Sequence, residues 1–326
     1  MPAILLRCLF VSGFLAIQQG STASSDSATN CDAEPPQLQS HASSVGTSLL
    51  QSRASSVGRT IQDNDRQPQA PPRIDYGHPS WLESCQSIYL DVGSNVGVQI
   101  RKLYEPRIYP GGKVLPLFEQ NFGPPTSRCA LANVSGLCAL GLEPNPLHHP
   151  RLRSIEQAYA DRGWHVHFYP FAAAYEDGTS VFEVGISRAS MEYWGARLAL
   201  RESQPISVNV TTIDFGLFIK SLPMHKIRLM KMDIEGAEWD ALASMEGHNA
   251  LCGEWVRAAF IEAHTIPRPH GSRAAHWQSD QTFAAIQARL ASQSCNAGTI
   301  SMINFDDESY LHDVATPPGH GSDCWW

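Results

Sequence analysis

Short apolar runs alternate with longer helix-like segments between residues 87 and 305, and this order leaves few folds open. The runs of strand length are residues 87–91, 137–142, 164–169, 227–232, 256–263 and 299–305. Helical patterns separate most of them, at residues 96–103, 146–162, 237–245 and 274–291. Such an alternation is typical of βαβ units, which build a mainly parallel α/β sheet with helices on both faces. Two further runs, 180–184 and 207–211, are expected to be added strands.

The N-terminal 72 residues are expected to lie outside this domain. Residues 1–23 hold an apolar run of signal-peptide length, followed by the small residues Ser21, Thr22 and Ala23. We expect a cleaved secretory signal peptide, with an uncleaved signal anchor or a buried helix as alternatives. Residues 24–72 have no Phe, Trp or Tyr and are expected to be a disordered Ser-, Gln- and Pro-rich linker, or else a Ser-rich targeting extension.

The composition excludes several classes of protein. Hydrophobic residues make up 43% of the chain, which argues against a wholly disordered protein. The 24 Lys and Arg residues face 32 Asp and Glu residues, and no basic block interrupts the sequence. Nucleic-acid binding usually needs a basic stripe, so no nucleic-acid partner is expected. After residue 23 no apolar run is long enough for a bilayer, so no membrane span is expected in the mature chain.

Glycines and an acid follow the first two apolar runs. Ligands of open parallel sheets bind beyond the carboxyl ends of the strands. There, Gly93 permits a turn with positive φ, and Gly97 would let the following helix approach the sheet. Glu143 follows the second run, where its carboxylate can accept two hydrogen bonds from a ribose diol. The glycines alone are compatible with a structural turn, but together with Glu143 they predict a nucleotide site.

Four segments resemble the signatures of FkbM-type methyltransferases. They are residues 91–97, 141–146 (Gly-Leu-Glu-Pro-Asn-Pro), 231–238 (Lys-Met-Asp-Ile-Glu-Gly-Ala-Glu) and 261–264 (Ile-Glu-Ala-His). The resemblance implies a class I, Rossmann-like, doubly wound fold with a mainly parallel, seven-stranded sheet. It also implies S-adenosylmethionine as cofactor and a hydroxyl as the usual acceptor. The residues expected to bind this cofactor are Asp91, Gly93, Ser94, Asn95, Gly97, Glu143 and Asn145.

Acidic residues beyond the fourth and fifth runs are the candidate catalytic groups. Asp233 is the first candidate for the base that removes a hydroxyl proton, and Glu235 is the second. An acid in the first turn of a helix can instead serve only the helix dipole, which is the alternative for Glu235 and Glu238. Glu262 and His264 are expected to face the same side. They could orient an acceptor, bind a metal or form a satisfied polar pair; the pair is preferred, no metal site is predicted, and His264 is the third catalytic candidate.

Three other segments carry weaker expectations. Residues 107–136, rich in Pro and Gly, are expected to form an inserted lid or surface excursion within the domain at 73–326. His148 and His149 are expected to be exposed at a helix start. Tyr193 and Trp194, with Met191, are expected either to line an acceptor pocket or to pack in the core.

Seven cysteines remain after the signal segment, and none forms a Cys-x-x-Cys pair, which disfavours zinc or thioredoxin-like chemistry. In an oxidising compartment several would pair, and the odd count leaves at least one free or intermolecular. Cys129 with Cys138 is one candidate local disulfide, but the spacing does not determine the connectivity. Sequons at Asn133 and Asn209 fit the same compartment, with Asn133 preferred because it falls in an expected loop.

The sequence therefore predicts a secreted or endomembrane methyltransferase that uses S-adenosylmethionine to O-methylate a glycan, a lipid or a small metabolite. The alternative is a non-catalytic binding protein on the same scaffold. An NAD(P)-dependent oxidoreductase would share the glycine turn and the acid. The chain lacks Gly-x-Gly-x-x-Gly, however, and that class leaves residues 231–238 unexplained. The oligomeric state is not predicted.

Overall fold

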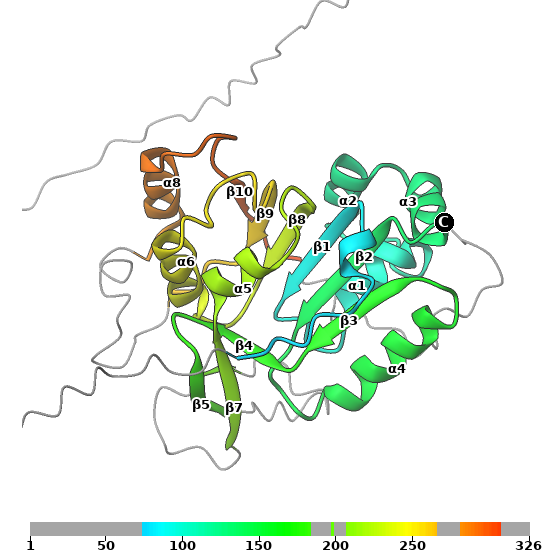
Figure 1. The fold of residues 1–326 in the computed structure, drawn as a ribbon, viewed down its shortest axis with the longest axis horizontal. Coiled ribbons are helices and arrows are strands. Elements are labelled where there is room, and N and C mark those ends of the chain that lie inside the picture. Colours follow the sequence, from blue (N-terminus) through cyan, green and yellow to red (C-terminus); the bar gives the residue numbers. More distant parts are fainter. Residues whose placement is uncertain (1–73, 184–196, 199–206, 266–280, 308–326) are drawn as a thin grey trace, which may run out of the picture. The chain divides into compact units, whose positions relative to one another are not determined.

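The computed structural model describes residues 74–183, 197–198, 207–265 and 281–307 (Figure 1). Contacts divide the chain between Gln67 and Pro68, and every described residue belongs to the second unit. The segments expected to be signal peptide and linker lie outside the described residues, and so do Met191, Tyr193 and Trp194.

A parallel sheet of six strands forms the centre of the described domain. Its strands are β1 (Ser87–Val92), β2 (Leu137–Leu142), β3 (His165–Tyr169), β8 (Ile227–Met232), β9 (Ala258–Ile261) and β10 (Ser301–Asn304). They follow the order β10-β9-β8-β1-β2-β3, and all neighbours are parallel. The strand order reverses beside β1, which is the Rossmann-like, doubly wound arrangement. This confirms the predicted fold class, with six strands among the described residues where the resemblance implied seven.

Helices cover both faces of this sheet (Figure 1). One face carries α1 (Val98–Tyr104), α2 (Leu115–Phe122), α3 (Pro125–Asn133) and α4 (His149–Ala160), and the other carries α5 (Phe215–Ser221), α6 (Glu238–Gly247) and α8 (Phe283–Ser292). Alternation along β1 explains the two layers, because successive side chains of a strand point to opposite faces. Ile88 and Leu90 pack with α5, α6 and α8, whereas Tyr89 packs with the other helices.

The expectation of a lid or surface excursion at residues 107–136 is wrong. This stretch forms the short 3-10 helix η2 (Pro106–Ile108) followed by α2 and α3. Phe118 of α2 and Ala132 of α3 are fully buried in the same cluster as Tyr89. The prolines mislead because they occupy the first turns of α2 and α3, where proline is well tolerated.

A smaller, four-stranded sheet lies beside the carboxyl end of β3 (Figure 1). It contains β4 (Phe171–Ala174), β5 (Gly178–Glu183), β6 (Arg197–Leu198) and β7 (Ser207–Asp214), in the order β4-β7-β5-β6. The two predicted added strands correspond to β5 and β7, and Asn209 is exposed on β7. Asn133 is the exposed last residue of α3, directly before a turn at Val134 and Ser135, and its side-chain oxygen accepts a hydrogen bond from Trp164 Nε1 at 3.0 Å.

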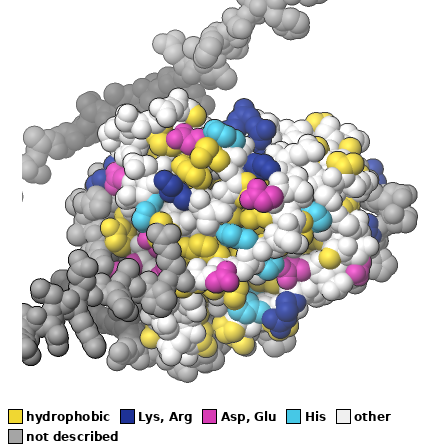
Figure 2. All heavy atoms as spheres, in the orientation of Figure 1, with side chains coloured by type: hydrophobic (Ala, Val, Ile, Leu, Met, Phe, Trp, Pro, Cys, Tyr) yellow, Lys and Arg dark blue, Asp and Glu magenta, His cyan; other side chains and the backbone are white. Residues whose placement is uncertain are grey.

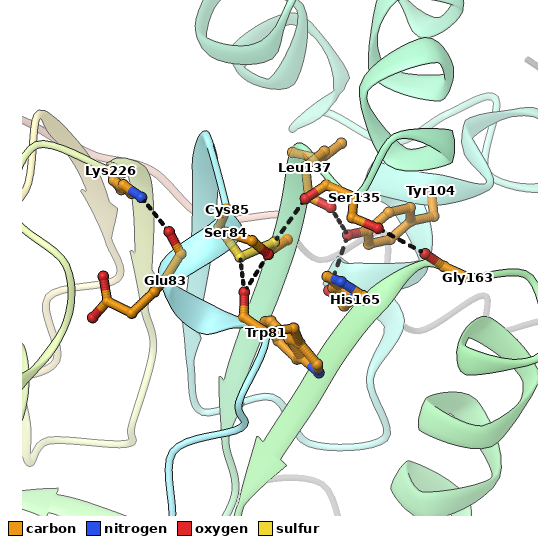
Figure 3. Close-up of a disulfide and its surroundings, with 11 residues drawn as sticks. Trp81, Glu83, Ser84, Cys85, Tyr104, Ser135, Leu137, Gly163, His165 and Lys226 are labelled. Carbon is orange, nitrogen blue, oxygen red and sulfur yellow. Dashed lines mark hydrogen bonds between the residues drawn. A yellow bond between two sulfur atoms is a disulfide. The ribbon is translucent and has the colours of Figure 1, made fainter.

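Two disulfides, Cys85–Cys138 and Cys252–Cys295, join cysteines that both lie among the described residues. The candidate pairing of Cys129 with Cys138 is wrong; Cys129 is disulfide-bonded in another pair. Because β1 and β2 are parallel neighbours, the Cα atoms of Cys85 and Cys138 come within 6.0 Å, which suits a disulfide. Figure 3 shows this bond beside the short 3-10 helix η1 (Leu82–Ser84). It joins the amino-terminal ends of the two central strands and leaves their carboxyl ends for a ligand site.

The described surface mixes charges of both signs. On the face drawn in Figure 2, Lys and Arg side chains lie apart from one another, with acidic and histidine side chains between them. Among the described helices, none has the length and apolar character that a bilayer crossing requires.

Candidate functional site

An open cleft lies at the carboxyl ends of β1, β2 and β8, and the empty space in and in front of it, open solvent included, is about 830 Å³. The strands are paired so that Val92 lies opposite both Leu142 and Met232. The residues that follow these three, Gly93, Glu143 and Asp233, therefore come together at one edge of the sheet, and all of them line the cleft. This edge is the position where doubly wound folds bind their ligands.

Gly93 allows the ends of β1 and β8 to approach closely. Its φ is +84°, and a Cβ atom at this position would collide with the carbonyl oxygen of Asp233. Two residues further on, Asn95 has a φ of +51°, which is uncommon for a residue other than glycine. Its backbone N–H donates to Glu143 Oε2 at 2.6 Å, so this strained residue is held by the end of β2.

Glu143 is 5% exposed, and both of its carboxylate oxygens are engaged by backbone. Oε2 accepts from Asn95, and Oε1 accepts from the N–H of Asn145 at 2.8 Å. A carboxylate has about four lone-pair directions, so these two bonds orient the group and leave acceptor capacity toward the cleft.

His148 also lines the cleft, and the expectation that it is exposed is wrong. It is 4% exposed, and its Nδ1 lies 3.6 Å from Glu143 Oε1. Helix α4 begins one residue later, so the end of the loop turns His148 inward over Glu143. The neighbouring His149 is half-buried, with its Nε2 2.9 Å from the carbonyl oxygen of Glu143.

Lys231 connects the glycine turn to the acids beneath it. Its Nζ donates to the carbonyl oxygen of Gly93 at 2.8 Å and lies 3.2 Å from Asp233 Oδ2 and 3.8 Å from Asp91 Oδ1. Burial alone would lower the pKa of Lys231, but Asp233 and Asp91 outweigh it and raise that pKa. Asp91 is fully buried, and this burial raises its pKa to about 6 although Lys231 opposes the shift.

A second polar group surrounds His264, just beyond β9. Its Nδ1 is 3.1 Å from Glu238 Oε1, and its Nε2 is 3.2 Å from Glu262 Oε1 and 3.9 Å from Glu235 Oε2. The contact with Glu262 confirms that these two side chains face the same side. Burial alone would lower the pKa of His264, but hydrogen bonds to Glu238 and Glu262 and the charges of Glu238 and Glu235 raise it to about 11.

Glu235 lies between the cleft and this group. Its φ is +55°, and its side chain lines the cleft with a third of its surface exposed. Burial raises the pKa of Glu235 although His264 opposes the shift. A carboxyl group with a raised pKa is a better proton acceptor than an ordinary one.

Six of the predicted site residues line the cleft, namely Gly93, Ser94, Asn95, Glu143, Asp233 and Glu235. The other four predicted residues are not among those that line the cleft. Asp91 is buried beneath the turn, and Asn145 is buried and donates to Glu143. His264 contacts Glu262 and lies close to Glu235, which itself lines the cleft. At Gly97 a Cβ atom would lie 2.7 Å from Ile155 Cδ1. The missing side chain therefore leaves room for α4, and not for α1, the helix that follows Gly97 in the sequence.

Sequence reasoning missed several lining residues. The second sheet contributes Phe171, Ala172 and Phe182, which no motif marks. Gln99 lies in the first turn of α1, and its Oε1 is buried without a hydrogen-bond partner, as is Asn95 Oδ1. A polar residue two positions after Gly97 was the available signal for Gln99.

Asp91→Asn tests the electrostatics beneath the turn. The pKa of Asp91 is about 6 in the folded chain against the ordinary 3.8, so the folded state binds the proton more tightly. The wild-type free energy of unfolding should therefore fall as pH rises from about 4 to 6. The uncharged variant should gain stability relative to wild type over this range, by on the order of 3 kcal/mol at most.

Urea denaturation at pH 4, 5, 6 and 7 measures this difference. Asp161→Asn removes an exposed carboxylate and serves as the control, with an expected effect within about 0.5 kcal/mol. A difference between Asp91→Asn and wild type that stays constant with pH would contradict the assigned burial effect.

Comparison with known proteins identifies a family for this chain. Residues 91–296 match the methyltransferase FkbM domain. Among solved structures, methyltransferase FkbM from Methylobacillus flagellatus KT is similar over 50% of this chain and 30% of that chain, with 12% identity and a TM-score of 0.28. The chain thus spans less than a third of that protein, and no curated protein matches it. Because the family match covers more than half of its length, the chain belongs to the methyltransferase FkbM family.

Proposed function

We propose that this methyltransferase uses S-adenosylmethionine to methylate a hydroxyl group of a glycan, a lipid or a small metabolite. The observation that carries the proposal is the row of Gly93, Glu143 and Asp233 along one cleft. It combines a turn that brings the ends of β1 and β8 together, a buried carboxylate and a second carboxylate at the same edge of the sheet. Family membership supports methyl transfer, whereas the donor and the acceptor are inferred from these residues.

The polar atoms of the cleft fit this methyl donor. Glu143 has acceptor capacity for the two hydroxyls of a ribose. Asn95 Oδ1 and Gln99 Oε1 are buried acceptors without a partner, and such atoms are costly unless a donor reaches them. The ammonium group of the methionine moiety is a suitable donor. The sulfonium, when bound, supplies a methyl group that is already activated, and the carboxylates of Asp233 and Glu235 favour a cation.

Apolar residues complete the cleft on the side of the second sheet. Phe171 and Ala172 of β4 and Phe182 of β5 provide a wall without charged groups. This wall suits uncharged parts of the donor or the acceptor, as is usual for small-molecule sites. Because it comes from the strands between β3 and β8, we infer that this region contributes to the choice of acceptor.

The protein's task in such a reaction is mainly alignment. Holding the hydroxyl oxygen in line with the methyl carbon supplies much of the rate enhancement. The remaining task is to take up or hold the hydroxyl proton. Asp233 is placed for this because Lys231 and the close approach to Gly93 fix its position. Glu235 is the alternative, since it also lines the cleft.

Glu143→Ala tests the cofactor assignment. It removes hydrogen bonds between a charged acceptor and the ribose, each worth about 1.5–3 kcal/mol, and it releases Asn95. The affinity for S-adenosylmethionine should fall about ten- to a thousandfold in calorimetric titration. Glu119→Ala, on the exposed side of α2, should leave the affinity unchanged. Unchanged binding in a folded Glu143→Ala variant would remove the assignment.

Asp233→Asn separates a catalytic role from a binding role. The amide keeps the shape of the side chain but cannot take up a proton. If Asp233 acts on the hydroxyl, kcat should fall by about 10²–10⁴ while cofactor affinity barely changes. Steady-state kinetics and titration on the same preparation measure both quantities. A large loss of affinity with kcat preserved would assign Asp233 to the cofactor, and full activity would move the role to Glu235 or His264.

A further inference from the structure

Three potential metal ligands meet at the ends of β8 and β9. Met232 pairs with Ile261 across these strands, so Asp233 and Glu262, the residues that follow, come side by side. With His264 they form a group in which one donor atom from each residue lies within 4.8 Å of the others. Glu262 and His264 alone did not predict a metal site. The strand pairing adds Asp233, which lies far away in the sequence.

The buried carboxylate of Glu238 contacts Nδ1 of the His264 ring. Glu238 is fully buried, and its Oε1 lies 3.1 Å from His264 Nδ1. The backbone N–H groups of Ile234, at 2.9 Å, and Gly236, at 3.3 Å, donate to the same oxygen. Its Oε2 is buried without a hydrogen-bond partner. Metal-binding histidines almost always donate their second ring N–H to such a carboxylate, carbonyl or water, which leaves the other nitrogen for the metal.

The charges around this group favour an added cation. Asp233, Glu235, Glu238 and Glu262 all surround or adjoin His264. Lys231 offsets one of them through its ion pair with Asp233, and a protonated His264 offsets another. A bound metal ion would take the place of the proton on His264 Nε2, because only a neutral imidazole is a ligand. Buried and half-buried carboxylates at this density are stabilised by pairing or by coordinating a metal ion.

We propose that Asp233, Glu262 and His264 bind a divalent cation at the edge of the cleft, with Mn²⁺ as the best match. Carboxylates suit Mg²⁺, Ca²⁺ and Mn²⁺, while imidazole suits borderline transition metals, and Mn²⁺ accepts both. Three protein ligands leave coordination positions open for water or a substrate. Asp233 also lines the cleft, which puts the proposed cation next to the space available for an acceptor.

The role of this cation rests on the proposed function. Two oxygens on neighbouring carbons, as in a vicinal diol or an α-hydroxy acid, would replace water in the open positions. The cation would make the hydroxyl more acidic. The hydroxyl proton passes to water in the open cleft, the hydroxyl oxygen forms the new bond to the methyl carbon, and the carbon–sulfur bond breaks with its electron pair staying on sulfur. Asp233 then acts on the hydroxyl through the cation.

Metal binding is measured on the full chain without any methyl donor. Electron paramagnetic resonance of free Mn²⁺ gives stoichiometry and affinity, and the relaxation rate of water protons reports exchangeable water on the bound ion. We expect one Mn²⁺ per chain with exchangeable water. Glu262→Gln should weaken binding by at least about tenfold, and Glu238→Gln by about 10–100-fold, as loss of an outer-shell partner does. Glu119→Gln is the control and should bind as wild type does.

Two results would overturn the proposal. One is binding no tighter than about 1 mM for Mn²⁺, Mg²⁺ and Zn²⁺ alike, beyond the range of ordinary protein sites for such ions. The other is binding that survives both Glu262→Gln and Asp233→Asn in variants that circular dichroism shows to be folded. Bound Mn²⁺ without exchangeable water would overturn the role toward an acceptor. The proposed methyl transfer can fail independently of the metal site. In that case the protein would bind Mn²⁺ as expected but would not bind S-adenosylmethionine.

Discussion

The register of the parallel strands determines the whole site. Val92, Leu142 and Met232 lie opposite one another, and Met232 also lies opposite Ile261. The next residue of each strand therefore enters the same edge of the sheet, which places Gly93, Glu143, Asp233 and Glu262 in one row. A shift of one residue in any strand would move its polar residue away from the others and turn its side chains to the opposite face.

This arrangement has an electrostatic cost that the surrounding residues reduce. Asp91 is fully buried, and its pKa is raised because burial disfavours the charged carboxylate. Lys231 offsets part of this cost and at the same time holds Gly93 and Asp233. Backbone N–H groups donate hydrogen bonds to the carboxylates of Glu143 and Glu238 and so reduce the cost of burying them. The acids of the cleft are thus held in place before any ligand arrives, which is what alignment of a methyl donor and an acceptor requires.

The sequence predicted the central strands and the residues at their ends because apolar runs and the polar residues after them are local signals. It failed where the outcome depends on distant contacts. The pairing of Cys138 with Cys85 follows from the neighbouring positions of β1 and β2, which cysteine spacing does not reveal. Helices α2 and α3 were missed because their prolines resemble those of loops. His148 faces inward because of where α4 begins. The signal peptide and secretion stay predictions.

The central claim is that the cleft binds S-adenosylmethionine. Parallel calorimetric titrations of the wild-type protein with S-adenosylmethionine and with NAD test it most directly, because a nucleotide site with a glycine turn and an acid could in principle serve either. The account predicts saturable binding of S-adenosylmethionine with one molecule per chain and no comparable binding of NAD. Binding of NAD in preference to S-adenosylmethionine, or binding of neither by a folded protein, would contradict it.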